Sequence, residues 1–210
     1  MKNKLLKLIL LSFMVVPIWG HETYANEFSV YKYEETDIPF SKENIDKNMI
    51  SSHFCEMEKI KDYEDKLSWF KAYKAINERY KDWVDVPETL YDYFSKKELN
   101  KLFKTVEAEC TGGDFDSKCN VASVIFNRLE HEDFGNTLDK VIIKSQFSPL
   151  KDGRYYKVDV TEETMLACEY AFEIEDTTGG ALYFDCAKDS WASRNKKKIF
   201  TDEIGHTFYK

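Results

Sequence analysis

The sequence predicts an α+β fold that is mainly α-helical, with a small β-sheet near the C-terminus. Residues 63–84, 95–110 and 161–173 carry apolar side chains every three or four positions, which is the period of a helix that buries one face. The shorter stretches ALYF and GHTFY are rich in aromatic residues, and the first follows Gly180 while the second begins with Gly205, which is typical of short strands. Because the helical stretches are longer and come first, we expect helices to form most of the core.

The chain begins MKNKLLKLILLSFMVVPIWGHETYAN, with lysines, then an apolar run, then small residues up to Ala25. This layout predicts a secretory signal over residues 1–25. Pro17 interrupts the apolar run, which is shorter than the ~20 residues of a spanning helix. We therefore expect a secreted protein with no stable membrane insertion after signal cleavage.

Signal removal changes the formal net charge from −8 to −10, because three lysines and one glutamate leave. An acidic chain disfavours nucleic acid and anionic membranes as partners. A hydrophobic content of 43% is that of a globular chain and not of a disordered one.

Residues 26 to about 55 are polar and weakly periodic, so we expect a linker or a loosely packed arm there. The helix over 63–84 carries an aromatic stripe that we interpret as core packing. The sequence thus predicts a linker plus an amphipathic helical region over 26–87, followed by a second region over 88–210.

The next helix has a clear start signal, Ser95 followed three residues later by Glu98, which is the pattern of a capping box. Its apolar face ends at Cys110, and two glycines follow. Glu107 and Glu109 lie on opposite flanks of that face, each about 80° from its centre. Periodicity does not choose between them, and either could face a cleft.

A further helix is expected to start near Asp116 or Ser117 and to run to Arg128. RYYKVDV alternates like a strand, and TEETMLACEYAFE reads as a helix capped by Thr161. In an exported protein the five cysteines predict two disulfides and one free thiol. The favoured pairs are Cys110 with Cys119 and Cys168 with Cys186, which leaves Cys55 free.

Three kinds of chemistry can be weighed from residue types. The sequence has four histidines, no HExxH motif and no close histidine pair, so we expect neither a metal nor another cofactor. A cysteine peptidase using Cys110 and His206 is an alternative, but a disulfide-bonded Cys110 is no nucleophile. A glutamate in a partly apolar cleft can stay protonated near neutral pH and act as a general acid on a glycosidic bond.

The stretch AECTGGDFDSKCNVASVIFNR, which begins at Ala108, resembles the signature of SleB-type cell wall hydrolases, the spore cortex-lytic enzyme family. The upstream YFSKKELNKLFKTVEAE is similar to the family's entry helix, and SQFSPLKDGR, ALYF and IGHTFY follow in the family's order. The resemblance covers about Leu90 to Lys210. The residues in register are Glu109, Gly112, Val121, Ala122, Val124, Ile125, Asn127 and Arg128.

This resemblance implies a lysozyme-like catalytic domain that cleaves the glycan strands of peptidoglycan, as a lytic transglycosylase or a muramidase. It assigns Glu109 as the general acid and base. We also expect a monomeric protein that is associated with the cell wall. The positions it places along the glycan cleft are Asn127, Gln146, Phe147, Ser148, Tyr183, Phe184 and His206.

The chain departs from the family at two positions, where Thr111 replaces an arginine and Gly113 a second glutamate. These departures leave open a catalytically inactive wall-binding protein. If the reaction were hydrolysis, Asp114 or Asp116 would have to supply the second carboxylate.

Overall fold

The computed structural model describes residues 42–210, so the expected signal over residues 1–25 lies outside the described part of the chain. The described residues form a mainly helical α+β fold with a small three-stranded sheet, which confirms the predicted fold class. Within residues 42–210, no helix has both the length and the apolar character needed to cross a bilayer. The elements are α3 (Lys42–Lys59), α4 (Lys66–Tyr80), α5 (Leu90–Tyr93), α6 (Lys96–Glu109), α7 (Phe115–Glu130), α8 (Leu138–Val141), α9 (Ser148–Asp152), the 3-10 helix η2 (Arg154–Tyr156), α10 (Glu162–Glu173), β1 (Tyr183–Asp185), α11 (Trp191–Asn195), β2 (Lys198–Thr201) and β3 (Thr207–Tyr209).

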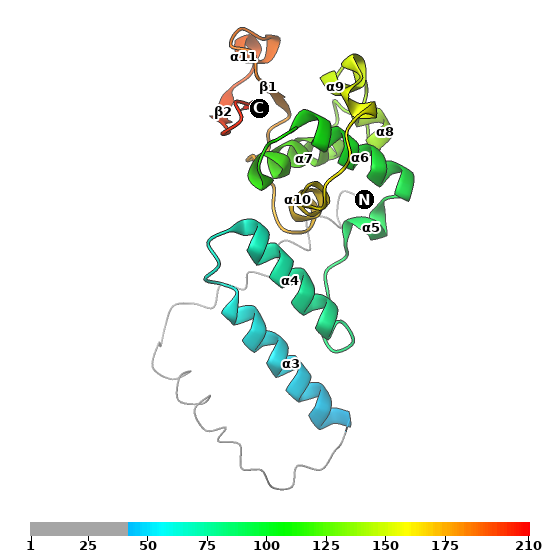
Figure 1. Cartoon of the computed structure of the whole chain (residues 1–210), viewed down its shortest axis with the longest axis vertical. Coiled ribbons are helices and arrows are strands. Elements are labelled where there is room, and N and C mark those ends of the chain that lie inside the picture. Colours follow the sequence, from blue (N-terminus) through cyan, green and yellow to red (C-terminus); the bar gives the residue numbers. More distant parts are fainter. Residues whose placement is uncertain (1–41) are drawn as a thin grey trace.

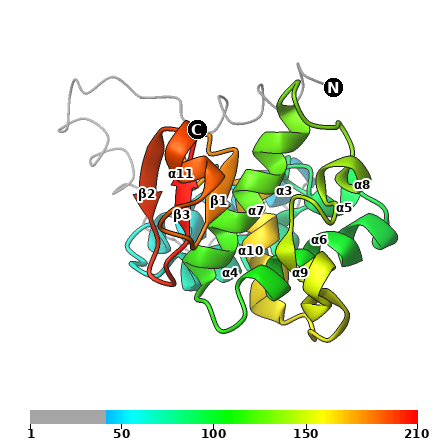
Figure 2. The ribbon, with the colours of Figure 1, turned by 90° about the horizontal axis from the view of Figure 1, so that it is seen from above.

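Helices α7 and α10 pack against each other at the centre, and α6 contacts both of them. The sheet lies on the other side of α7, with α11 beside it (Figure 2). Helices α3 and α4 pair at the opposite end of the molecule, and α4 joins them to the rest by packing on α10 (Figure 1). The end of α6 is therefore placed between the central helices and the α9 region.

Local start signals explain where the helices begin. The Ser95 hydroxyl accepts from the Glu98 backbone N–H while the Glu98 carboxylate accepts from Ser95, so the predicted capping box is present. Thr161 caps α10 as predicted. The expected loose arm is wrong from Lys42 onward, because α3 occupies this region and packs on α4.

The sheet has the order β1-β3-β2 and is antiparallel throughout. Strands β1 and β3 match ALYF and GHTFY, whereas β2 was not predicted. The expected strand at RYYKVDV is wrong, since this segment forms η2 and then runs without regular structure. Tyr155 and Val160 of this segment pack on the main core from an irregular backbone.

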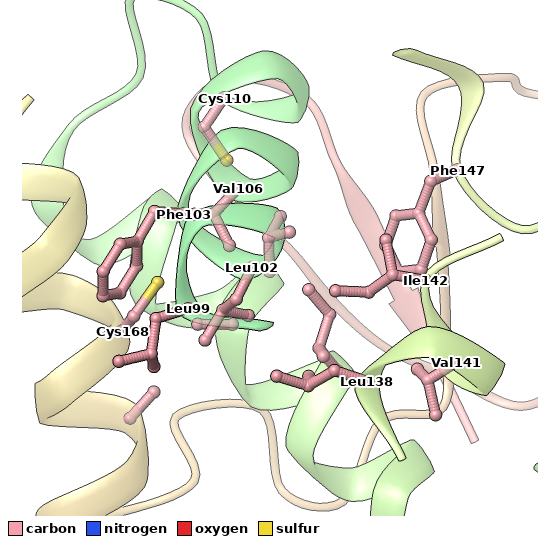
Figure 3. Close-up of a cluster of buried hydrophobic side chains, with 14 of the residues drawn as sticks. Leu99, Leu102, Phe103, Val106, Cys110, Leu138, Val141, Ile142, Phe147 and Cys168 are labelled. Carbon is pink, nitrogen blue, oxygen red and sulfur yellow. The ribbon is translucent and has the colours of Figure 1, made fainter. Parts of the chain in front are cut away.

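The main core lies between α6, α7, α8 and α10 (Figure 3). The apolar face of α6 contributes Leu102 and Val106, both fully buried, and Phe147 packs in the same cluster from the segment before α9. Close packing along α6 fixes the position of its last residue, Glu109.

The two predicted disulfides are absent, because all five cysteines are free thiols in the structure. Cys110 lies in the main core, where its thiol donates to the Ser117 carbonyl, while Cys119 points into a separate cluster. Cys168 is buried in the main core and Cys186 is exposed. In each favoured pair, one cysteine lies in the main core and the other lies in a separate cluster or at the surface. The length of the loop between two cysteines in the sequence does not reveal this separation.

We expect a thiol-reactive probe to label two of the five cysteines in the native protein, the exposed Cys55 and Cys186. The three buried thiols should react only after unfolding, because burial raises their pKa and blocks access. Counting labels by intact mass before and after denaturation measures this. Fewer than five labels in the unfolded, non-reduced chain would show that a disulfide forms after all.

Candidate active site

Glu109 is the last residue of α6, and Cys110 caps the helix. The chain then turns through Gly112, whose φ of +75° is a left-handed conformation that favours glycine. A side chain at Gly113 would lie 3.1 Å from the Cys110 carbonyl and from Ile204, so the glycine keeps this turn tight. The sharp turn leaves the Glu109 carboxyl half-buried at the end of the helix.

Burial raises the pKa of Glu109 to about 7. The Arg154 guanidinium and the Ser148 backbone N–H, which donates to the carboxylate, act in the opposite direction, while the charge of Asp152 raises the pKa further. At neutral pH the carboxyl is therefore close to its midpoint, where it can both give and take a proton.

Arg154 ties the end of α6 to α9. Its Nη1 donates to the Ala108 carbonyl at 2.8 Å, its Nη2 donates to the Ser148 hydroxyl at 2.8 Å, and its Nε donates to Asp152 at 2.9 Å. These bonds hold the Ala108 carbonyl, the Ser148 hydroxyl and the Asp152 carboxylate in fixed positions near Glu109. The planar guanidinium, whose donors have fixed directions, makes that arrangement rigid.

Glu107 has the opposite environment although it lies two residues away on the same helix. It is 7% exposed and accepts from the Thr161 N–H, the Thr161 hydroxyl and the Thr164 hydroxyl, at 3.0, 2.8 and 2.5 Å. Its pKa lies below the ordinary value because these hydrogen bonds, with the charge of Lys118, outweigh the effect of burial. Glu107 thus holds the N-terminus of α10, a structural role.

Arg128 forms a second positive group near Glu109, whose pKa it helps to lower. The side chain is 3% exposed, its Nε donates to the Leu182 carbonyl at 2.7 Å, and its Nη1 has no hydrogen-bond partner in the described chain. The guanidinium carbon lies 5.2 Å from the Phe147 ring centre and 5.9 Å from that of Tyr183. Arg128 therefore links α7, β1 and the segment before α9.

The structure places the sequence-predicted cleft residues at different depths. Gln146 and Ser148 are exposed, with Ser148 beside Glu109, and Tyr183 and Phe184 are half-buried on β1. The half-buried Asn127 donates from Nδ2 to Thr178 and to the Ala181 carbonyl, which holds α7 against the turn before β1.

Two of the expected cleft residues need correction. Phe147 is fully buried in the main core, and His206 is 5% exposed, with its ring against Phe184 and Phe208. Neither ring has a free face for a sugar, so both support the site from inside. The His206 Nδ1 lies 3.6 Å from Asp202, and burial lowers the pKa of the histidine.

The cysteine-based alternative has little support in this geometry. Cys110 is fully buried, and burial raises the pKa of its thiol, which opposes formation of the reactive thiolate. Among residues 42–210, no three histidine, cysteine, aspartate or glutamate side chains lie close enough together to hold a metal ion.

The two aspartates considered as second carboxylates have other partners. Asp114 caps α7 by accepting from the Ser117 N–H at 2.8 Å, and Asp116 pairs with Lys66 of α4 at 3.2 Å. The aspartate whose charge raises the pKa of Glu109 is Asp152, which the sequence reasoning missed along with Arg154. Both residues lie at the end of the SQFSPLKDGR motif, and this position was the feature of the sequence that could have identified them as site residues.

Comparisons with known proteins agree with this arrangement. Residues 112–209 match the family described as Cell Wall Hydrolase, and Glu109 lies three residues before this range. Two curated spore cortex-lytic enzymes of Bacillus cereus are 30% identical over 102 residues, which are 47% of this chain and 39% of each relative. The chain therefore spans well under half the length of these relatives.

Two solved structures are also similar. One is the catalytic domain of the germination-specific lytic transglycosylase SleB from Bacillus anthracis, with 25% identity and a TM-score of 0.52 over 58% of this chain and 100% of that chain. The other is the catalytic domain of the Bacillus cereus SleB protein, with 26% identity and a TM-score of 0.50 over 56% and 92%.

Proposed function

Because residues 112–209 form a SleB-type cell wall hydrolase domain, we propose that the protein cleaves the glycan strands of peptidoglycan with Glu109 as general acid and base. The single observation that carries this assignment is the environment of Glu109, a half-buried carboxyl whose pKa is raised to about 7. The proposal places the enzyme outside the cytoplasm, where its substrate lies.

The geometry suits the use of one carboxyl group in two successive proton transfers. Protonated Glu109 donates to the glycosidic oxygen as the bond to the leaving sugar breaks, and the positive charge that develops on the remaining sugar lies beside the new carboxylate. The Ser148 N–H and the charge of Arg154 stabilise that carboxylate. It then takes the proton from the sugar's own C6 hydroxyl, whose oxygen closes a 1,6-anhydro ring.

This route needs only one carboxylate, which agrees with the engagement of Asp114 and Asp116 in other contacts. Hydrolysis would need a second carboxylate to activate water or to act as a nucleophile. Asp152 is the candidate for that role, although Arg154 binds it through both its Nε and its backbone N–H.

We expect purified peptidoglycan treated with the protein to give anhydro-muropeptides, identified by mass spectrometry of the soluble products. Products with reducing ends would instead indicate hydrolysis, and Asp152→Asn would then be expected to abolish them. Absence of any product with either spore cortex or vegetative wall as substrate would contradict the proposed activity.

A further inference from the structure

A row of aromatic rings and positive groups leads away from Glu109 toward the outer side of the sheet. It starts at the Arg128 guanidinium and continues to Tyr183, whose ring centre lies 5.5 Å from that of Trp191. The Lys196 Nζ lies 4.6 Å from the Tyr183 ring centre and 5.5 Å from that of Trp191. Tyr183 is thus shared between the surroundings of Glu109 and a surface farther out.

Trp191 presents its ring to solvent, with 56% of the residue exposed. It begins α11, at the end of the molecule opposite the α3–α4 pair (Figure 1). A single exposed aromatic side chain is ordinary on a protein surface. Here, however, a second ring and an ammonium group pack against it, so the tryptophan is held in place as a flat surface before any ligand arrives.

A hollow of about 430 Å³ is lined by Tyr183, the ring that packs against Trp191. Lys196 and Lys210 line it together with Tyr183 and Asn127, and Glu130, His131 and Asp133 also contribute. Within residues 42–210, neither lysine has a carboxylate within 4.0 Å, and the Lys210 Nζ reaches only the Gly179 carbonyl, at 3.5 Å. In the described part of the chain, two ammonium groups therefore lack a carboxylate partner, although the net charge of the full sequence is −8.

We propose that Trp191, Tyr183, Lys196 and Lys210 form a second glycan-binding subsite, in which the rings pack on a sugar and the lysines bind a carboxylate carried by the strand. Ring faces suit the apolar face of a sugar, and unpaired ammonium groups suit an anion on the same polymer. The strand as occupant rests on the proposed function. The carboxylate has two possible sources, the peptide stems and the lactyl groups of those muramic acid units that carry no stem.

This subsite is remote from the bond that is cleaved, so its interactions are the same before and during the reaction. Such uniform binding lowers KM and leaves kcat nearly unchanged. The effect should be confined to strands long enough to reach from Glu109 to Trp191, and fragments of a few sugars should not respond.

The test compares Trp191→Ala and Lys196→Ala with Phe54→Ala and Lys59→Ala, matched changes of exposed residues on the distant helix α3. Binding to insoluble peptidoglycan is measured by depletion from solution, and cleavage kinetics are measured on long and short strands. We expect about tenfold weaker binding for the two subsite variants, an equally raised KM on long strands, and no change for the α3 controls.

Modified substrates identify the anion. Conversion of all carboxylates to amides should remove the difference between the wild type and Lys196→Ala. Removal of the peptide stems frees a lactyl carboxylate at each muramic acid. On such strands a persisting difference shows that a lactyl carboxylate can occupy the subsite, and a lost difference assigns the stem carboxylates.

Two outcomes overturn the proposal in distinguishable ways. If both subsite variants bind and cleave long strands as the wild type does, the subsite is wrong while the proposed activity stands. If the wild type neither binds nor cleaves peptidoglycan, the proposed function fails and the subsite fails with it. Trp191→Phe, which keeps a ring, should retain part of the binding and excludes a folding defect as the cause.

Discussion

Replacement of Glu109 by glutamine is expected to lower kcat/KM for glycan cleavage by about 10²- to 10⁴-fold, the usual contribution of a positioned general acid. Glutamine keeps the shape of the side chain but has no proton to donate to the glycosidic oxygen. The measurement is the initial rate of release of soluble fragments from peptidoglycan. Binding to the same peptidoglycan should be retained, because the glutamine still fits beside Ser148 and Arg154.

The same substitution should not destabilise the fold. A carboxyl with a raised pKa opposes folding when it is ionised, so above pH 7 the glutamine variant should be at least as stable as the wild type. A large loss of activity without a loss of stability is what separates a functional group from a structural one. A Glu109→Gln protein that keeps wild-type activity would contradict the proposed mechanism.

The dependence of kcat/KM on pH provides a second test of Glu109 as the general acid. The general acid must be protonated, and the pKa of Glu109 is raised to about 7, so kcat/KM of the wild type should fall as pH rises through 7. The residual activity of Glu109→Gln should lack this alkaline limb. Glu107→Gln, the identical change two residues earlier, should keep the limb wherever the protein is folded.

Much of the helical framework could be predicted because its signals are local. The capping box at Ser95 and the cap at Thr161 each depend on residues within one turn of the helix start, and both are present. Strand β2 begins at Lys198, the last residue of a run of lysines, and its sequence KIFT has no alternation that would reveal a strand. The strand is fixed by pairing with β3. Its existence therefore depends on a partner strand rather than on its own sequence.

The candidate site was only partly predictable for the same reason. Periodicity placed Glu107 and Glu109 symmetrically about the apolar face of α6, and contacts with later segments distinguish them. Thr161 and Thr164 bind Glu107, whereas Arg154 and Ser148 lie beside Glu109. Only the resemblance of the motif pointed to Glu109 in advance.

Glu107→Ala is expected to lower the free energy of unfolding by about 2–4 kcal/mol, measured by urea denaturation near neutral pH. The change leaves the Thr161 N–H and two threonine hydroxyls without their acceptor, and one of these hydroxyls belongs to the fully buried Thr164. Glu107→Gln retains one acceptor oxygen and should cost about half as much. For both variants kcat should match the wild type at temperatures where they are folded.

The loss of unfolding free energy on substitution of Glu107 should depend on pH in a defined direction. The folded-state pKa of Glu107 is lowered from 4.5, so its stabilisation is fully present above the unfolded pKa and disappears as pH falls through the lowered value. The difference in unfolding free energy between wild type and Glu107→Gln should therefore shrink in acid. If Glu107→Gln instead lost kcat with unchanged stability, the assignments of the two glutamates would have to be exchanged, because a carboxylate that only anchors α10 cannot limit the reaction.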